Sequence, residues 1–569
     1  MKKNALTTDF TRLMDTKLPW NEYPRPQFKR DSFICLNGEW DFEYSVSEPK
    51  TYTKKILVPF SPESNLSGIE KLHSDSEKLF YRRFFELPES FKKDRIILHF
   101  GAVDQTCEVF INGKSVGENQ GGYIPFCFDI TDFIFNGKNE IKVVATDTLS
   151  KIYPYGKQKK KRGGMWYTPV SGIWQTVWLE SIPKEPIRSI KITPSLDSVT
   201  IEVDTDAKQK SIRLTNSNEL FTFSSNSITI TPKNIVNWTP ENPYLYYFKL
   251  QTDTDKIESY FALREISVKK CGGVSKICLN NKPYLFNGLL DQGYFPDGLF
   301  LPATADGYIN DIKTAKSLGF NMLRKHIKIE PLIFYHLCDK LGIVVFQDMI
   351  NNSDYSFIRD TALPTVGLKR LPDKTMHRDS ASRKTFSDTM LKTAELLYNT
   401  PSVLYYTVFN EGWGQFCADE MYELLKSTDS KRIIDSTSGW FWQRKSDVDS
   451  HHIYFKRLKV KINPNKPAVI SEFGGFSHRC EGHLFGDANY GYTTIADRQD
   501  FENRVVKLYT DEALPLVKKG VSALVYTQLS DIEDETNGFM TYDRKILKVD
   551  KERFSKLSKM LCDAFAEGE

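Results

Sequence analysis

The chain has 569 residues, 40% of them hydrophobic, which is enough for roughly three to four domains with ordinary cores. The formal net charge of +4 is small for this length, so we expect no nucleic-acid partner. No segment approaches the roughly 20 apolar residues of a membrane span, and residues 1–20 contain no apolar run of signal-peptide length.

The nine cysteines are odd in number and scattered, without a CxxC pair. This pattern is typical of reduced thiols rather than of a disulfide or zinc framework. We therefore expect a cytoplasmic protein that binds no membrane. No metal, nucleotide or redox cofactor has a recognisable site.

Residues 1–183 are predicted to form an all-β domain. Short alternating runs recur between turns: EWDFEYSV, LFYRRFFEL, RIILHFGAV, CEVFINGKSVG, EIKVVATDT and WQTVWLESI. INGK and FNGK carry Asn-Gly steps, the strongest hairpin signal. The spacing favours a jelly-roll sandwich. The basic run KQKKKRGG at 157–164 is interpreted as a solvated loop rather than a nucleic-acid patch, because it is isolated in a nearly neutral chain.

Residues 184–267 continue the β pattern with IRSIKITP, SVTIEVDT, SIRLTNS, YLYYFKLQT and ESYFALREISV. Pro183 and Pro186 mark the entry to this stretch. Its length suits one small immunoglobulin-like β-sandwich.

Residues 268–569 alternate short apolar strands with longer helical periodicities. The strand candidates are YLFNGLL, NMLRKH, IVVFQDM, VLYYTVFNE, RIIDSTSGW, DVDSHHIYF, AVISEFGG and ALVYTQLSD. Helix candidates include TADGYINDIKTAKSLG, PLIFYHLCDKLG and QDFENRVVKLYTDEALPLVKKG. Eight strands with intervening helices in roughly 300 residues predict a (β/α)8 TIM barrel.

Two glutamates follow apolar strands and precede glycines in this region. Glu411 ends the fourth predicted strand in TVFNEGWG, and Glu472 ends the seventh in VISEFGG. Charged groups at the carboxyl ends of barrel strands are where such barrels keep their chemistry. A pair of carboxylates across one cleft is what glycoside hydrolysis requires: one protonates the leaving oxygen and the other attacks the anomeric carbon. Asn410 could hydrogen-bond the sugar 2-hydroxyl.

Each feature also has a structural interpretation. A single strand-end Glu is more often a helix cap or an ion-pair partner, and Trp413 is more often a packing residue than a sugar platform. The two glutamate motifs together, in barrel order, favour the catalytic interpretation.

The motifs resemble those of the glycoside hydrolase family 2 enzymes, which include β-galactosidases, β-glucuronidases and β-mannosidases. The similar segments are LNGEWDF, FGAVDQTCEVFINGKSVG, GGMWYTPVSGIWQTVWLE, WTPENPYLY, FALREISV, NEGW and SEFGG. The resemblance implies that Glu411 is the acid/base and Glu472 the nucleophile of a retaining double displacement. It also implies substrate-binding or supporting roles for Asn410, Arg324, His326, Tyr454, Trp413 and Trp440.

The chain departs from the family pattern after three strands. After the first strand, Asp291 and Gln292 replace the Arg-His-Glu-like stretch that is usual in the family, and they become substrate-binding candidates. After the second strand, RKHIKIEP is one residue shorter than the usual family segment. After the eighth strand, YTQLSD lacks the tryptophan that is common in the family. No Asn-x-Lys follows Glu472, which argues against a glucuronidase, although Arg479 or Arg544 could serve the same purpose.

We therefore expect an exo-acting, retaining β-glycosidase with a carbohydrate substrate, first a β-galactoside. β-Glucuronides and β-mannosides are the alternatives with the same chemistry. A non-catalytic carbohydrate-binding protein is the alternative of another class. The resemblance also implies a homo-oligomer, and a homodimer built through the β-domains is expected.

Overall fold

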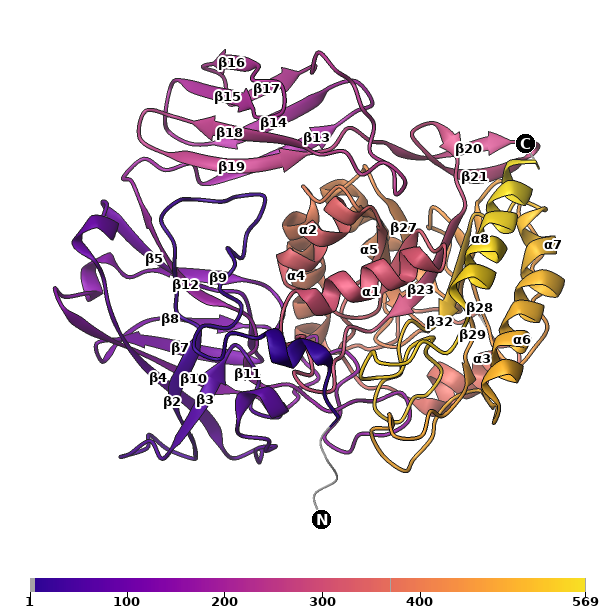
Figure 1. Cartoon of the computed structure of the whole chain (residues 1–569), viewed down its shortest axis with the longest axis horizontal. Helices are drawn as coiled ribbons and strands as arrows, with labels where there is room; N and C mark the ends of the chain where they lie inside the picture. The colour runs from indigo at the N-terminus through magenta and orange to yellow at the C-terminus, as the bar shows by residue number, and fades with distance from the viewer. Residues whose placement is uncertain (1–5, 369, 568–569) are drawn as a thin grey trace.

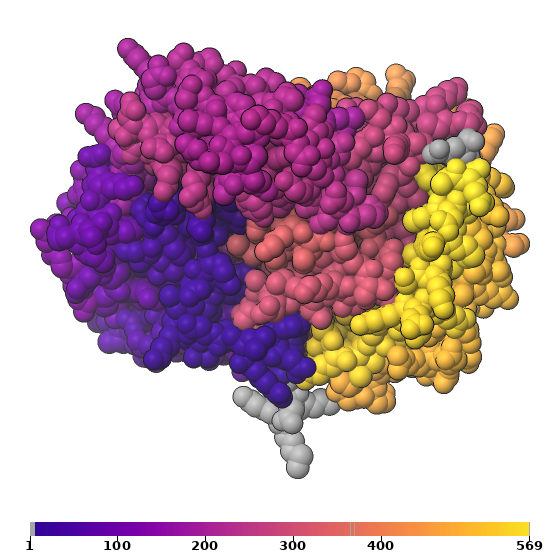
Figure 2. Space-filling view, turned by 45° about the horizontal axis from the view of Figure 1, so that its top comes forward, coloured from indigo at the N-terminus to yellow at the C-terminus, as the bar shows by residue number. Residues whose placement is uncertain are grey.

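The computed structural model describes residues 6–368 and 370–567 and contains three regions that pack side by side. In Figure 1 the jelly-roll region is indigo to purple, the immunoglobulin-like region is magenta, and the barrel runs from rose to yellow. The space-filling view shows all three regions in extensive contact (Figure 2). The predicted multidomain fold class is confirmed.

The jelly-roll region has two main antiparallel sheets, ordered β1-β12-β5-β9 and β3-β2-β4-β10-β7-β8, and a short β11-β6 pair. Strand β10 alternates buried and half-buried side chains, as expected when one face of a sheet covers a core. The strands are β1 Ile34–Cys35, β2 Gly38–Ser45, β3 Lys54–Val58, β4 Lys78–Glu86, β5 Arg95–Phe100, β6 Val103–Asp104, β7 Thr106–Ile111, β8 Lys114–Gln120, β9 Phe126–Asp129, β10 Lys138–Thr146, β11 Gly172–Ile173 and β12 Val177–Ile182.

The two Asn-Gly steps have different outcomes. Asn112 and Gly113 both have positive φ and join the antiparallel pair β7–β8, so this hairpin prediction is confirmed. Gly137 in FNGK precedes β10, which pairs with β4 and β7 rather than with β9. The second hairpin prediction is wrong, because this turn carries the chain from one sheet to the other. The Asn139 side chain holds the turn by accepting from Phe135 N at 2.7 Å and donating to Gly137 O at 2.9 Å.

The immunoglobulin-like region packs the sheet β13-β14-β17 against the sheet β16-β15-β18-β19 around an apolar core. Its strands are β13 Ser189–Pro194, β14 Val199–Asp204, β15 Lys210–Leu214, β16 Leu220–Phe223, β17 Ser227–Ile230, β18 Tyr246–Gln251 and β19 Lys256–Phe261. A small sheet of β20 Ile266–Cys271, β21 Val274–Leu279 and β22 Lys282–Pro283 crosses the predicted 267/268 boundary. The exact domain boundaries stay predictions.

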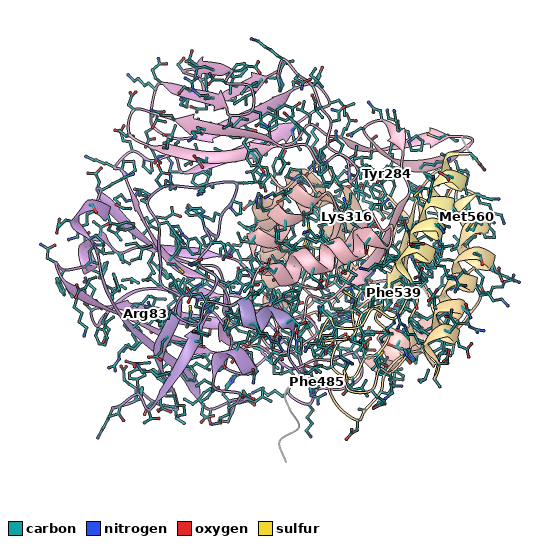
Figure 3. All side chains as sticks on the ribbon, viewed as in Figure 1. Arg83, Tyr284, Lys316, Phe485, Phe539 and Met560 are labelled. Atoms are coloured by element: carbon teal, nitrogen blue, oxygen red, sulfur yellow. The ribbon has the colours of Figure 1, made fainter. Side chains whose placement is uncertain are left out.

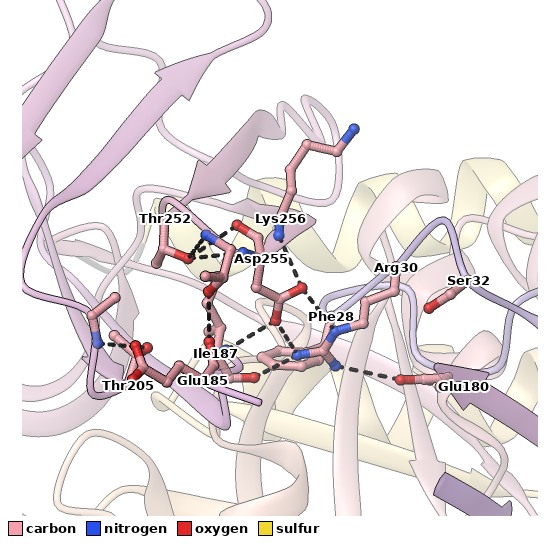
Figure 4. Close-up of polar contacts among 12 residues, drawn as sticks. Phe28, Arg30, Ser32, Glu180, Glu185, Ile187, Thr205, Thr252, Asp255 and Lys256 are labelled. Carbon is pink, nitrogen blue, oxygen red and sulfur yellow. Dashed lines mark hydrogen bonds and ion pairs between the residues drawn. The ribbon is translucent and has the colours of Figure 1, made fainter. Parts of the chain in front are cut away.

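A buried arginine joins the first two regions (Figure 4). Arg30 lies 2.8 Å from Asp255 of the immunoglobulin-like region and 3.3 Å from Glu180 of β12. It also donates to the carbonyl of Ile187 at 2.5 Å. The guanidinium is therefore neutralised and hydrogen-bonded from both sides, as a buried charge requires.

The barrel is one parallel sheet in the order β27-β26-β25-β24-β23-β32-β29-β28. Its strands coincide with the eight predicted apolar runs, most of them buried on both faces. They are β23 Phe286–Asp291, β24 Met322–Lys325, β25 Val344–Asp348, β26 Val403–Asn410, β27 Ile433–Ser438, β28 Asp449–Ile453, β29 Ala468–Gly474 and β32 Ala523–Thr527. A short β30 Phe476–Ser477 and β31 Thr493–Thr494 pair follows β29.

Side chains close the barrel between its end strands, β27 and β28. Ser450 Oγ donates to the Thr437 carbonyl at 3.4 Å, and Ser438 Oγ lies 3.0 Å from His452 Nε2. A ring of strands can close in this way because polar side chains replace the missing backbone ladder. The closure draws His452 toward the centre of the barrel mouth.

Helices follow six of the eight barrel strands along the chain. They are α1 Asp306–Ser317, α2 Leu332–Leu341, α3 Leu363–Thr365, α4 Ser380–Leu397, α5 Ala418–Thr428, α6 Arg498–Leu508, α7 Leu514–Val517 and α8 Lys551–Ala566. The three helix candidates are confirmed, but residues 439–448 and 454–467 form loops, so β27 and β28 are not followed by helices. Figure 3 shows side chains filling the space between elements, with Lys316 on α1 and Met560 on α8. In the described part of the chain, no helix combines the length and apolarity needed to span a membrane.

Candidate active site

Glu411 and Glu472 meet at the carboxyl end of the barrel. Glu411 directly follows β26, the fourth strand, and Glu472 lies near the end of β29, the seventh. Their nearest carboxylate oxygens lie within 4.8 Å of each other. Carboxyl groups about 5–5.5 Å apart are typical of retaining glycosidases, and about 6.5–9.5 Å is typical of inverting ones. The separation therefore favours a retaining geometry.

The backbone at Glu411 explains the Gly-Trp-Gly sequence that follows it. Glu411 has φ +54°, a left-handed conformation that is uncommon for a residue with a side chain and is concentrated at functional sites. Gly412 also has positive φ, and a Cβ there would lie 2.1 Å from the ring of Phe441. The strand thus ends in a sharp turn that only glycine permits, and this turn lifts the Glu411 carboxylate onto the barrel rim.

Glu472 is buried and surrounded by groups that favour its ionised form. Arg324 Nη1 lies 3.0 Å from Oε1, and the Tyr454 hydroxyl donates to Oε2 at 2.6 Å. Burial by itself raises the pKa of Glu472, but the interactions with His452 and Arg324 outweigh burial and lower the pKa to about 2. The carboxylate is therefore charged at neutral pH.

Arg324 connects four strands of the barrel beneath this pair. Besides Glu472, its guanidinium donates to Asp348 Oδ1 at 2.9 Å, to Asn410 Oδ1 at 2.9 Å and to the Ser471 carbonyl at 2.8 Å. Because Asn410 Oδ1 accepts from Arg324, the amide group has a fixed orientation. No hydrogen bond from Asn410 Nδ2 is formed within the described residues, so this donor remains free for a ligand in the cleft.

His452 bridges the two glutamates and is not among the site residues expected from the sequence. Its Nδ1 lies 2.9 Å from Glu411 Oε1 and 3.7 Å from Glu472 Oε2. Its Nε2 lies 3.0 Å from Ser438 Oγ, which fixes the ring. The signal was present in HHIYF, because His452 stands two residues before Tyr454 and residues two apart share a strand face.

The ligand atoms of Glu411, His452 and Glu472 lie close enough together to hold a metal ion. Arg324 argues against this use, since its Nη1 contacts Glu472 Oε1 at 3.0 Å and lies 3.4 Å from His452 Nε2. A divalent cation there would sit beside a fixed, buried positive charge. The three residues therefore suit a proton-transfer site better than a metal centre.

His326 lies beside the same network. Its Nδ1 lies 2.7 Å from Asp348 Oδ2. Burial lowers the pKa of His326 to about 4, and Lys157 lowers it further against the opposing charge of Asp348. The imidazole is thus neutral at neutral pH, and Asp348 selects the tautomer in which Nδ1 donates. Nε2 remains an acceptor.

Asp291 and Gln292, two further sequence candidates, lie at the tip of β23. Asp291 is occupied by an ion pair with Lys325 at 2.7 Å and by the Gly293 amide at 2.9 Å. Gln292 donates to Gln528 Oε1 at 3.1 Å. The structure therefore places Asp291 in a buried ionic network beneath the site, and Gln292 in the amide network of the loop after β32.

The two tryptophan candidates have different surroundings. Trp413 is buried, donates to the Ser353 carbonyl at 3.3 Å, and packs edge-on against Tyr155 and Trp166 of the jelly-roll region. Trp440 donates to the Glu411 carbonyl at 2.8 Å and packs edge-on against His452. Trp413 thus supports the domain junction, whereas Trp440 supports the turn that carries Glu411.

Tyr454 is held on both sides. Its hydroxyl lies 2.7 Å from Thr527 Oγ1 in addition to its bond to Glu472. Its ring stacks on Tyr492 with centroids 4.1 Å apart. Thr527 and Tyr492 are not among the residues expected from the sequence, because nothing in their local motifs marks them.

The loop after β32 brings a further acid to this edge. Gln528 Nε2 donates to Glu535 Oε2 and to Asn537 Oδ1, each at 2.7 Å. Burial raises the pKa of Glu535 to about 6, against the lowering effect of Lys157.

Comparisons with known proteins agree with this architecture. The family model described as "Glycosyl hydrolases family 2, sugar binding domain" matches residues 52–183, and the model described as "Glycosyl hydrolases family 2, TIM barrel domain" matches residues 268–559. The β-galactosidase of Pseudoalteromonas haloplanktis is 26% identical over 469 residues, covering 71% of this chain and 42% of the relative. The β-galactosidase of Thermoanaerobacter pseudethanolicus is 27% identical over 341 residues, covering 55% and 44%. The chain thus spans less than half the length of these curated relatives.

Solved structures match nearly end to end. A β-glucuronidase of an uncultured Clostridium sp. superposes with a TM-score of 0.73 at 16% identity, covering 95% of this chain and 99% of that one. A β-galacturonidase from Eisenbergiella tayi bound to galacturonate gives a TM-score of 0.68 at 19% identity, covering 96% and 99%. These identities show the fold alone. The barrel match covers more than half of the sequence and includes the strands that carry both carboxylates, so the chain belongs to glycosyl hydrolase family 2.

Proposed function

We propose that the protein is a retaining exo-β-glycosidase that removes terminal, non-reducing β-linked sugars. One observation carries the proposal: two carboxylates lie within 4.8 Å of each other at the barrel mouth and have unequal surroundings. Glu472 contacts Arg324 and Tyr454, whereas Glu411 contacts His452 and is more exposed. Unequal environments are what separate a nucleophile from an acid.

In the first step Glu472 attacks the anomeric carbon while Glu411 gives its proton to the glycosidic oxygen. The bond from the anomeric carbon to that oxygen breaks, the aglycone leaves as an alcohol, and a covalent ester joins the sugar to Glu472. In the second step ionised Glu411 takes a proton from water, and the oxygen of that water attacks the anomeric carbon. The ester then breaks, and the product keeps the β configuration.

Neighbouring groups position the reacting atoms. The Nδ2 group of Asn410 is the proposed donor to the sugar 2-hydroxyl, a contact that strengthens in the transition state. Tyr454 donates to Glu472 Oε2 and Arg324 donates to Oε1, so the two contacts together fix the orientation of the carboxylate. His452 links the two carboxylates through Nδ1 and orients Glu411 Oε1 for proton transfer.

Two classes of glycone have support. One is the neutral β-galactoside expected from the sequence, and the other is an acidic β-uronide. The curated relatives described above are β-galactosidases, and the similar structures are β-uronidases. Acidic and neutral glycones therefore both belong in the first assay. Cytoplasmic location and a homodimer remain predictions.

A panel of p-nitrophenyl β-glycosides (galactoside, glucuronide, galacturonide and mannoside), followed by proton NMR of the first-formed anomer, tests the proposal. We expect one glycone to be preferred and its β-anomer to form first. Appearance of the α-anomer first would overturn the retaining mechanism. Tight sugar binding without turnover on any substrate would favour the non-catalytic alternative.

A further inference from the structure

A loop of the jelly-roll region reaches over the mouth of the barrel. The loop covers residues 155–168, and its first part is fixed to the segment after β25. The backbone amides of Tyr155 and Gly156 both donate to the Asn351 carbonyl, at 3.1 and 3.2 Å, and the Tyr155 hydroxyl donates to the Ser353 carbonyl at 2.8 Å. These contacts hold the loop at the third strand.

The other end of the loop is fixed to the segment after β32. The Tyr167 hydroxyl donates to Glu535 Oε2 at 3.0 Å, and the Thr168 amide donates to Glu533 Oε1 at 2.9 Å. Arg162, between these ends, lies over the ring of Phe485, which is labelled in Figure 3. The loop is therefore fixed to barrel segments after the third and the eighth strand.

Lys157 lies between these two attachments. Its carbonyl accepts from the Tyr167 amide at 2.9 Å, and the preceding Gly156 packs against the Ile327 carbonyl, one residue after His326. The side chain is half-buried. Within residues 6–368 and 370–567, its ammonium forms no hydrogen bond and has no carboxylate oxygen within 4.0 Å.

The charge of Lys157 nevertheless acts on the site. Burial is the larger influence on the pKa values of Glu472, Glu535 and His326, raising those of the two acids and lowering that of the histidine. Lys157 lowers all three pKa values, as a positive charge near these groups does.

Other cations near the mouth have partners. Lys325 pairs with Asp291 and Glu330, and Lys328 also pairs with Glu330. The two arginines suggested by the sequence are also engaged elsewhere: Arg544 pairs with Asp311 at 3.1 Å, and Arg479 donates to the Asp487 carbonyl at 3.0 Å. Lys157 is thus the cation near the nucleophile that remains open to a ligand in the described part of the chain.

We propose that Lys157, supplied by the jelly-roll region rather than by the barrel, binds the carboxylate of the sugar and makes β-hexuronides the preferred substrates. A carboxylate brings one negative charge, which one ammonium neutralises. A phosphate dianion would leave a charge uncompensated near Glu472 and Glu535. This inference rests on the proposed glycosidase function and narrows its glycone.

The test compares Lys157→Gln, Lys157→Arg and the control Lys161→Gln, which alters an exposed lysine of the same loop. For wild type we expect uronides to be better substrates than the galactoside. Lys157→Gln should lower kcat/KM on the preferred uronide about ten- to hundred-fold, mainly through KM, because one charge-assisted hydrogen bond is lost. The galactoside rate should change less than about two-fold. Lys157→Arg should retain much of the uronide activity, and Lys161→Gln all of it.

Equal losses on acidic and neutral substrates would overturn the inference, because they would mean that Lys157 acts on the nucleophile or the pocket shape. A wild type that prefers the galactoside would also overturn it and leave the glycosidase function intact. Calorimetry of free galacturonate, galactose and galactose 6-phosphate needs no turnover. Tighter binding of galacturonate that Lys157→Gln abolishes supports the inference even if hydrolysis fails, and a preference for either other sugar refutes it.

Discussion

Glu472→Gln is the sharpest test of the proposed nucleophile, because the structure indicates that the protein tolerates it. Glutamine keeps the shape of the side chain, and its oxygen can still accept from Arg324. Arg324 also keeps its bonds to Asp348, Asn410 and the Ser471 carbonyl. The Tyr454 hydroxyl can turn toward Thr527 Oγ1, 2.7 Å away, and accept from the new amide.

The expected cost in stability is therefore small and the cost in rate large. One charge-assisted hydrogen bond is lost, which destabilises the fold by about 1.5–3 kcal/mol. The amide cannot form the glycosyl ester, so we expect kcat to fall at least about 10⁴-fold, equivalent to about 5.4 kcal/mol in the activation free energy.

The assay is hydrolysis of the preferred aryl glycoside with and without sodium azide, together with thermal unfolding. Azide needs a vacated space, so the azide arm uses a second variant, Glu472→Ala, which should give an α-glycosyl azide from the aryl glycoside. The matched control is Glu502→Gln. It changes a buried glutamate of α6 that pairs with Arg553 of α8 at 2.9 Å and makes no hydrogen bond or ion pair with Glu411 or Glu472 among the described residues. Near wild-type turnover by Glu472→Gln, or a β-glycosyl azide from Glu472→Ala, would refute the assignment.

Three further predictions concern the acid, the bridging histidine and the domain junction. Glu411→Gln should slow poor leaving groups about 10²–10⁴-fold and dinitrophenyl glycosides much less, because only the former need the proton; a uniform loss across a leaving-group series would contradict the acid role. His452→Asn should lower kcat/KM about ten-fold or more and move the acid limb of the pH profile upward. The reason is that His452 lowers the pKa of Glu472, so its removal raises that pKa and the ionised nucleophile is lost at a higher pH; an unchanged profile would count against the bridge. Arg30→Met should destabilise the protein by about 3–5 kcal/mol in denaturant titrations, because it leaves Glu180 and Asp255 short of a buried cation; equal unfolding midpoints would show that the junction adds no stability.

Local patterns correctly predicted the elements that depend mainly on their own residues. All eight barrel strands were visible as apolar runs, because strands buried on both faces need apolar side chains along their length. FNGK was interpreted wrongly, since an Asn-Gly step favours a turn but does not determine which strand pairs next. The loops after β27 and β28 were missed for a similar reason: the expected helices follow from the usual barrel repeat and not from a pattern in those residues.

The sequence by itself determined the strands, the ends at which Glu411 and Glu472 emerge, and the glycines that turn the chain there. Because all strands of such a barrel are parallel, their carboxyl ends lie at one edge, and chain direction alone was sufficient to predict that Glu411 and Glu472 emerge at the same edge. Only the tertiary structure decided which side chains complete the site. His452 reaches both acids because it lies where side chains close the barrel, and the loop that carries Lys157 is held at the barrel mouth by contacts from another domain. Contacts between residues far apart in the sequence depend on packing that no local motif encodes. Arg324 and Glu472, which are 148 positions apart, are an example.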